Sequence, residues 1–377
     1  MTLPHSHLAD EISGAFDGFY HGKTVLVTGH TGFKGSWLAL WLTSLGARVV
    51  GYALDPPSTP SHFEAADLGS LIVDIRGDIR DRTTLVDALQ THRPDIVFHL
   101  AAQALVRQAY NEPVDTFGTN VMGTVNVLDA VLRTDSVSAA VIISSDKCYR
   151  NQEWPWGYRE TDTLGGSDPY SASKGCAELA VTTFRDAVVQ RKYRDRWLPI
   201  ASARAGNVIG GGDWAEDRLV PDVLSAFLGG RAACIRRPLA VRPWQHVLEP
   251  LGGYLLLAQR LHAQGAPFAT AWNFGPDAAD AQPVQGVVEQ LARLWGEGAG
   301  WQSQPGDHPH EASLLMLDVS RARHQLGWRP RLPLEAALQM VVDWARAHRD
   351  GADARTLTLR QIQAYQALCT RPNKDAE

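Results

Sequence analysis

The apolar stretch Thr24-Val25-Leu26-Val27-Thr28 is followed at once by Gly29-His30-Thr31-Gly32-Phe33-Lys34-Gly35, and Ser36-Trp37-Leu38-Ala39-Leu40-Trp41-Leu42 continues with helical spacing. A strand, a glycine turn and a helix in this order are typical of a turn that binds the phosphates of a dinucleotide. Glycines let the backbone approach the pyrophosphate, and the helix N-terminus offers free N–H groups. The glycines are spaced Gly-x-x-Gly-x-x-Gly rather than Gly-x-Gly-x-x-Gly, so the prediction depends on this context.

The next apolar run, residues 48–54, predicts a strand that ends at Asp55, about 20 residues after the last glycine. A carboxylate there accepts hydrogen bonds from the adenosine ribose and repels a 2′-phosphate, which favours NAD over NADP. No arginine is adjacent to Asp55 in the sequence. The alternative is a plain turn before Pro56-Pro57.

Strand-like and helix-like segments then alternate as far as Ala205. Strands are expected at 71–73, 95–100 and 139–143, and helices at 82–91 and 114–132. This alternation predicts a Rossmann-like α/β fold, a doubly wound parallel sheet, over residues 21–205. We expect a poorly ordered lead-in (1–20), a smaller, mixed α/β and mainly substrate-binding portion (206–370), a segment that packs back on the first domain (243–270) and a tail (371–377).

The composition of the chain narrows its class. With 377 residues, 45% of them hydrophobic, the chain is long enough for one large or two modest domains. A net charge of -5, from 36 basic and 41 acidic residues, makes nucleic acid a poor partner. No signal peptide, membrane span or metal-binding spacing is seen, including at His308 and His310, so we expect a cytoplasmic protein without a metal.

Polar residues follow the apolar run 139–143: Ser144-Ser145-Asp146-Lys147-Cys148-Tyr149. The carboxyl ends of parallel strands face the ligand crevice, so Asp146 and Lys147 are candidates for an acid/base pair. The alternative is an exposed turn, where Asp and Lys are common.

A second pair of candidates begins the helix expected from Asp168 to about Gln190. Tyr170 and Lys174 are four residues apart and share a helix face. An ammonium beside the phenol would lower the pKa of Tyr170 and make it a usable base near neutral pH.

Arginines gather after the regular alternation stops, which suits a phosphorylated small molecule because guanidinium binds phosphate with two parallel hydrogen bonds. Solvated surface arginines are the alternative for any single one. The cluster consists of Arg218, Arg231, Arg236, Arg237 and Arg242.

The glycine turn, Asp55, the Ser144-Ser145 strand end and Tyr170/Lys174 resemble the extended short-chain dehydrogenase/reductase superfamily. Within it, residues 28–35, 145–149, 204–214 (Arg-Ala-Gly-Asn-Val-Ile-Gly-Gly-Gly-Asp-Trp) and 242–247 (Arg-Pro-Trp-Gln-His-Val) resemble the family of CDP-glucose 4,6-dehydratases, a group of nucleotide-sugar dehydratases. The similarity extends from about Phe19 to Leu368, and block 204–214 is its specific part.

The resemblance implies a lyase that converts CDP-glucose to CDP-4-keto-6-deoxyglucose with tightly bound NAD, within deoxysugar and lipopolysaccharide O-antigen biosynthesis. Tyr170, helped by Lys174 and Ser145, would take the 4-hydroxyl proton while hydride passes from C4 to NAD. Water would then leave across C5 and C6, and the hydride would return to C6. Where dTDP- and GDP-sugar dehydratases have Asp-Glu, this chain has Asp146 to protonate the 6-hydroxyl and Lys147 to remove the C5 proton. An ion pair between these two would stabilise the wrong charge states, so their side chains are expected to diverge.

The same resemblance implies a cofactor site at the glycine turn and the strand ends, in which Lys34 could reach a phosphate: Gly29, Thr31, Gly32, Phe33, Lys34, Gly35, Asp55, Asp78, Ile79, Ala101, Gln103, Asn120, Tyr170 and Lys174. The diphosphate and nucleoside of the substrate would be held by Asn207, Arg236, Arg242 and His246. Related enzymes pair helices from about Val114 and Pro169, so a homodimer or homotetramer is expected.

Three alternatives remain at this point. A nucleotide-sugar 4-epimerase needs Tyr170 and Lys174 but not Asp146 and Lys147. A dehydratase could act on the glucose of another nucleoside diphosphate. An NAD-binding sensor without catalysis would need neither pair.

Overall fold

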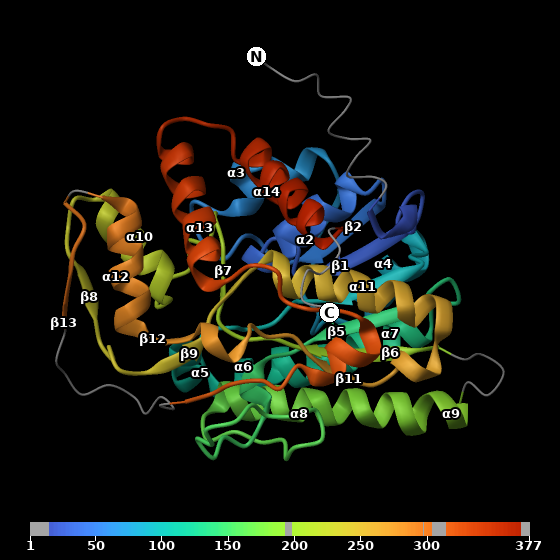
Figure 1. The fold of residues 1–377 in the computed structure, drawn as a ribbon. Helices are drawn as coiled ribbons and strands as arrows, with labels where there is room; N and C mark the ends of the chain where they lie inside the picture. The colour runs from blue at the N-terminus through green and yellow to red at the C-terminus, as the bar shows by residue number, and fades with distance from the viewer. Residues whose placement is uncertain (1–14, 193–197, 297, 304–313, 371–377) are drawn as a thin grey trace.

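The structure, a computed structural model, describes residues 15–192, 198–296, 298–303 and 314–370. Within them the central sheet is parallel and has seven strands in the order β11-β6-β5-β4-β1-β2-β3 (Figure 1). This confirms the predicted doubly wound sheet. The strands are β1 (Thr24–Thr28), β2 (Arg48–Ala53), β3 (Val73–Arg76), β4 (Ile96–His99), β5 (Ala139–Ile143), β6 (Ile200–Arg204) and β11 (Ala271–Asn273).

Helices cover both faces of this sheet because its strands are apolar on both sides. One core joins the sheet to α2 (Phe33–Ser44), α11 (Leu248–Gln264) and α14 (Ala354–Cys369). The other core joins it to α4 (Arg82–His92), α7 (Thr124–Leu132) and α8 (Pro169–Thr183). The chain order reverses between β1 and β4, and a ligand crevice is expected at the carboxyl ends of strands where this happens.

The smaller lobe lies beside this layer and contains α10, α12, β8 and β13 (Figure 1). Its own apolar core includes Val223, Val288 and Val341. Within the described residues it also has three two-stranded sheets, so that the lobe is mixed α/β. Its elements are β7 (Val208–Ile209), α10 (Leu219–Leu228), β8 (Ala233–Ile235), β9 (Val241–Pro243), β10 (Gln245–His246), β12 (Ala281–Pro283), α12 (Val284–Trp295), β13 (Trp301–Ser303) and α13 (Leu334–Arg349).

Several boundaries differ from the predicted ones. The third strand begins at Val73, not Leu71, because Leu71 closes a turn by donating its N–H to the carbonyl of Leu68. The helix expected over 114–132 comprises α6 (Pro113–Phe117), a π-helical segment (Gly118–Gly123) and α7, and α8 continues through π-helical Phe184–Val188 into α9 (Val189–Lys192). The structure also has the short helices α3 (His62–Ala65) and α5 (Val106–Asn111).

The domain limits also need adjustment. Tyr20, in the expected lead-in, is fully buried and donates a hydrogen bond to the carbonyl of Leu255 at 2.7 Å. Helix α11 lies with the large sheet, as predicted for the segment 243–270, but β11 and α14, from the range 206–370, lie there too rather than with the smaller lobe. Residues 1–14, the tail 371–377, and His308, His310 and Glu311 lie outside the described residues.

Candidate active site

The glycine turn connects β1 to α2 and is shaped by close backbone contacts. Gly29 has φ +75°, and a Cβ there would lie 2.7 Å from the backbone nitrogen of Ala101. A Cβ on Gly35 would overlap the carbonyl oxygen of Gly29. Gly32 precedes α2 and gives it no side-chain cap, so the first N–H groups of the helix face the turn without a capping side chain. This cradle fits the pyrophosphate of NAD.

A cavity of about 1130 Å³ extends from this turn, along the carboxyl ends of the strands, to the smaller lobe. All but two of the predicted site residues line it. Those that line it are Gly29, Thr31, Gly32, Phe33, Lys34, Gly35, Asp55, Asp78, Ile79, Ala101, Gln103, Ser145, Asp146, Lys147, Tyr170, Lys174, Asn207, Arg236 and Arg242. The tertiary structure therefore brings the predicted cofactor, catalytic and substrate residues into one space.

Asn120 and His246 are the two exceptions. Asn120 is buried behind the cavity, where it exchanges hydrogen bonds with the backbone of Gln103 (2.9 and 3.0 Å) and donates to Ser173 Oγ at 2.9 Å. His246 is fully buried, 5.8 Å from Trp37 between ring centroids, and its Nδ1 accepts from the N–H of Leu248. Neither residue lines the cavity, and contact of either one with cofactor or substrate stays a prediction. Asn120 holds Gln103 in place.

Two charged residues of the cofactor half have neighbours that the sequence does not reveal. Asp55 pairs with Arg76 of β3, Oδ1 to Nη1 3.6 Å, although no arginine is its sequence neighbour. Lys34 turns inward and donates to the hydroxyl of Tyr254 at 2.9 Å. Burial, followed by the charges of Lys174 and Arg218, lowers the pKa of Lys34 to about 7. Lys34 therefore contacts α11 and also lines the cavity, and its reach to a cofactor phosphate stays a prediction.

Asp146 lies at the carboxyl end of β5 in the 3-10 turn Asp146–Cys148 and is buried. Ser145 Oγ donates to its Oδ1 at 2.9 Å, and Asn207 Nδ2 lies 3.4 Å from Oδ2. Lys147 is half-buried and directs its Nζ toward the ring of Tyr170, 5.9 Å from the centroid. Between these two described residues there is no ion pair within 4.0 Å, and the divergence expected in a substrate complex stays a prediction.

Tyr170 and Lys174 are both buried on the same face of α8. The prediction that the pKa of Tyr170 is lowered is wrong when only the groups of the protein itself act on it. Burial raises the pKa of Tyr170 to about 12, and Asp146 adds to this, while a hydrogen bond with Ser145 and the charge of Arg218 act in the opposite direction. Burial also lowers the pKa of Lys174 to about 8, against the charge of Glu178. Desolvation disfavours both the phenolate of Tyr170 and the ammonium of Lys174. It outweighs the attraction between these two charges that their spacing predicts.

Arginines converge at the mouth of the cavity in the smaller lobe. Arg107 of α5 and Arg236 approach the same oxygen of Asp217, at 3.1 and 3.2 Å. Arg218 pairs with buried Asp213 at 3.2 Å. Arg107 and Asp217 were not predicted, and no sequence pattern points to Arg107, because it comes from the other lobe. Arg231 is exposed and does not line the cavity.

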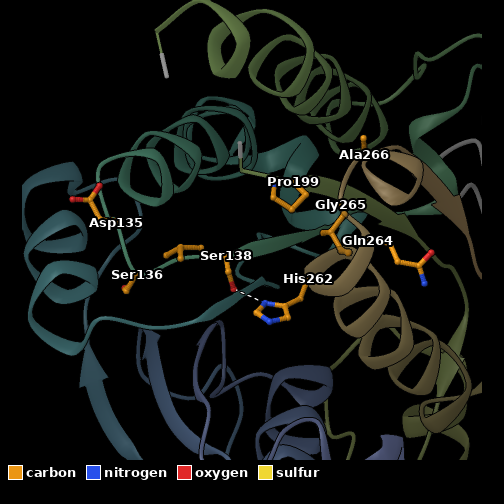
Figure 2. A pocket seen from close by; sticks show the side chains of 10 residues that line it. Asp135, Ser136, Ser138, Pro199, His262, Gln264, Gly265 and Ala266 are labelled. Carbon is orange, nitrogen blue, oxygen red and sulfur yellow. Dashed lines mark hydrogen bonds between the residues drawn. The ribbon is translucent and has the colours of Figure 1, made fainter. Parts of the chain in front are cut away.

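A second, smaller cavity of about 740 Å³ lies at the opposite, amino-terminal ends of β5 and β6 (Figure 2). There Ser138 Oγ lies 2.7 Å from Nδ1 of His262, and also donates to the carbonyl of Asp95 at 2.8 Å. Its walls carry none of the predicted site residues.

In the part of the chain that the structure describes, no group of His, Cys, Asp and Glu side chains is arranged to hold a metal ion. The same residues form no helix long and apolar enough to cross a membrane.

The sequence and the fold of this chain are similar to those of known proteins. Residues 25–273 match the family described as "NAD dependent epimerase/dehydratase family". The CDP-glucose 4,6-dehydratase of Salmonella typhimurium is 51% identical over 354 residues, covering 94% of this chain and 99% of that protein. The crystal structure of dTDP-glucose 4,6-dehydratase from Bacillus anthracis in complex with NAD has the same fold, with a TM-score of 0.71, 20% identity, and coverage of 89% of this chain and 100% of that one. The protein MoeE5 in complex with UDP-glucose and NAD gives a TM-score of 0.72, 26% identity, and coverage of 86% and 99%.

Proposed function

The chain belongs to the NAD dependent epimerase/dehydratase family, and from this premise we propose that it is a dehydratase that converts CDP-glucose into CDP-4-keto-6-deoxyglucose and water. The observation that carries the proposal is that Asp146 and Lys147 line the same cavity as Tyr170 and Lys174. A 4-epimerase would need only the second pair. The identity of 51% with the Salmonella CDP-glucose 4,6-dehydratase supports the same substrate.

The two halves of the cavity would divide the binding. NAD, when bound, would take a hydride from C4 of the glucose and return one at C6. The glycine turn would hold its pyrophosphate, and Asp55 its adenosine ribose. In the smaller lobe, Arg236 and Arg242 line the cavity and would bind the diphosphate of the substrate.

Tyr170 would remove the 4-hydroxyl proton, since its phenol already shares a hydrogen bond with Ser145. The phenolate is disfavoured by burial, and the charges of Lys174 and of the oxidised cofactor would oppose that effect. Ser145 would hold the hydroxyl of the sugar between itself and Tyr170. This arrangement is that of a general base with an orienting hydroxyl.

Asp146 and Lys147 would then remove the water. Asp146, buried at the carboxyl end of β5, would protonate the departing 6-hydroxyl. Lys147 lies above the ring of Tyr170 and would take the C5 proton as a neutral amine. The hydrogen bonds of Ser145 and Asn207 to Asp146 would hold its carboxyl group away from Lys147.

Incubation of the protein with NAD and CDP-glucose tests the proposal. We expect a 4-keto product that absorbs in strong alkali, and loss of turnover by about 10²–10⁴-fold in Tyr170→Phe. CDP-galactose as product would instead establish an epimerase. Full turnover by Tyr170→Phe, or no turnover with any of CDP-, dTDP-, GDP- or UDP-glucose, would reject the catalytic assignment and leave a binding protein.

We further infer a homodimer or homotetramer that acts in the cytoplasm, in deoxysugar and O-antigen biosynthesis. Large apolar side chains stand exposed on neighbouring helical segments: Val114 (83%) on α6, Met122 (53%) before α7 and Leu179 (57%) on α8. A second copy of the chain would cover them. Sedimentation analysis of the chain and of Val114→Lys checks this, since the charge should dissociate the pair.

A further inference from the structure

Behind the catalytic residues, Glu178 occupies the next position on the same helix face. Tyr170, Lys174 and Glu178 of α8 are spaced by four residues and are all buried. Glu178 is 1% exposed, the least of the three. A carboxylate at this depth must be matched by partners, because an unpaired buried charge is strongly destabilising.

Glu178 has three such partners, which come from the ends of two strands. Oε1 accepts a hydrogen bond from Ser144 Oγ, and Ser144 directly precedes the Ser145-Asp146-Lys147 segment. Oε2 accepts from Ser202 Oγ at 2.8 Å and from Arg204 Nη2 at 2.7 Å. The carboxylate therefore fixes α8 against β5 and β6 at the level of the active site.

Arg204 extends this contact to the far side of the sheet. Its Nη1 donates to the hydroxyl of Tyr149 at 2.7 Å and to the carbonyl of Glu160 at 3.1 Å. The Tyr149 hydroxyl in turn donates to Oδ1 of Asn273 in β11 at 2.7 Å. The turn that carries Asp146 and Lys147 is thus anchored on both sides, by Ser144 and by Tyr149.

Glu178 also contributes charge. Burial lowers the pKa of Lys174, and the carboxylate of Glu178 is the largest effect that raises it. The other titratable groups that face Lys174 are Tyr170 on α8, Cys148 in the turn after β5, Lys34 on α2 and His99 at the end of β4. Of these, Lys34 and His99 are cationic when protonated, and Cys148 and Tyr170 are neutral when protonated. Glu178 is therefore the group in this set that is held negative, because its pairing with Arg204 and its hydrogen bonds lower its pKa although burial raises it.

We propose that Glu178 is a positioning residue for the proposed dehydratase reaction: it fixes α8 to the ends of β5 and β6, and its negative charge keeps Lys174 an ammonium beside Tyr170. Only the catalytic consequence of the Lys174 ammonium rests on the proposed function. The contacts of α8 with β5 and β6, and the effect of the Glu178 charge on Lys174, do not depend on which reaction the protein catalyses.

The test is a pH titration of the Lys174 side chain by carbon NMR of the lysine-labelled full chain, assigned with Lys174→Met. In Glu178→Gln, which keeps the size of the side chain, we expect the titration of Lys174 to move to lower pH by roughly one unit. The alkaline limb of kcat/KM should move with it. Glu178→Asp keeps the charge and should leave the midpoint close to that of the natural chain.

Arg204→Lys is the matched control, because it disturbs the same buried pair without removing a charge. It should reduce thermal stability but leave the Lys174 midpoint in place. If Glu178→Gln does not fold, the double variant Glu178→Gln/Arg204→Met avoids an unpaired buried arginine and should show a smaller downward shift, because a positive charge is removed as well. An unchanged midpoint in a folded variant would overturn the proposal whether or not the protein acts on CDP-glucose.

Discussion

Gly206 lies directly against the carboxylate of Asp146, so that a Cβ at position 206 would overlap both oxygens of that carboxylate. Asn207 follows and places its Nδ2 3.4 Å from Oδ2 of the same residue. The strand end after β6 therefore determines where the proposed general acid can lie.

Gly206→Ala should accordingly displace Asp146. We expect kcat to fall by about 10–10²-fold, because small displacements of a catalytic group are costly, and stability to fall by about 1–3 kcal/mol from overpacking. Gly286→Ala on α12 is the control, since its Cβ would meet only Gln282 Oε1 at 3.8 Å. Steady-state kinetics and thermal unfolding measure both effects. Unchanged kinetics in Gly206→Ala would show that Asp146 is not held at this place.

Asp146→Asn and Lys147→Met should block the loss of water but not the first oxidation. Asn has the shape of Asp but cannot donate the proton, and Met cannot accept one. We expect turnover to fall by about 10²–10⁴-fold while reduced nicotinamide accumulates on the enzyme, seen by its near-ultraviolet absorbance. Tyr170→Phe should show no such accumulation. If both variants keep full turnover, the proposed roles of Asp146 and Lys147 in the loss of water are wrong.

Asp55→Asn should improve the use of NADP. Removal of the carboxylate takes away the repulsion of a 2′-phosphate and leaves Arg76, which lies 3.6 Å from Asp55 and also pairs with Asp74 at 2.8 Å, as a positive charge nearby. We expect the preference for NAD over NADP to drop by about tenfold, measured as the ratio of dissociation constants. Adding Arg76→Ala to Asp55→Asn should remove the improvement in NADP binding. Equal preference before and after Asp55→Asn would contradict a ribose contact at this position.

Asp217→Asn should strengthen substrate binding. Asp217 pairs with both Arg107 and Arg236 through one oxygen, and Arg236 is one of the residues proposed to bind the diphosphate. We expect KM for CDP-glucose to fall several-fold with kcat unchanged, since exposed ion pairs of this kind are weak. Glu216→Gln removes the same charge from the exposed neighbour and should change KM less. A rise in KM would mean that Asp217 orients the arginines rather than competing for them.

Glu249→Gln should alter how stability depends on pH. Burial raises the pKa of Glu249 to about 7, although the N–H groups of Arg331 and Leu332 and the hydroxyl of Tyr365 donate to it. A carboxyl group whose folded pKa is raised contributes stability below its unfolded pKa of about 4.3, and this is lost as pH rises through about 7.

The free energy of unfolding of the natural chain should therefore fall by roughly 2–3 kcal/mol between pH 4 and pH 8 because of this group. Glu249→Gln should not show this fall. Denaturant unfolding at both pH values measures the difference. Parallel stability curves for the two proteins would contradict the raised pKa.

Local patterns were enough to predict much of the fold and the site. The run 24–35 contains its own strand, turn and helix signals, and the structure has β1, Gly29 at φ +75° and α2 there. Tyr170 and Lys174 share a face because four residues make about one helical turn, and the Ser145-Asp146-Lys147 segment lies at a strand end because an apolar run precedes it. Each of these relationships is set by neighbours in the chain.

Other features depend on segments far apart in sequence. Arg76 reaches Asp55 because β3 pairs beside β2. His246 is enclosed by Trp37 of α2 although its sequence block resembles a substrate site. The raised pKa of Tyr170 likewise follows from burial that spacing does not reveal.

The sequence by itself determined the parallel α/β architecture, the glycine turn and the placement of the two candidate catalytic pairs, because short-range periodicity and backbone preferences specify them. Only the tertiary structure decided that Asn120 and His246 lie outside the cavity, that Arg107 and Arg236 meet at Asp217, and that Gly206 borders Asp146. The physical reason is that burial, desolvation and charge pairing are properties of groups brought together by packing, and packing joins residues whose separation along the chain carries no periodic signal.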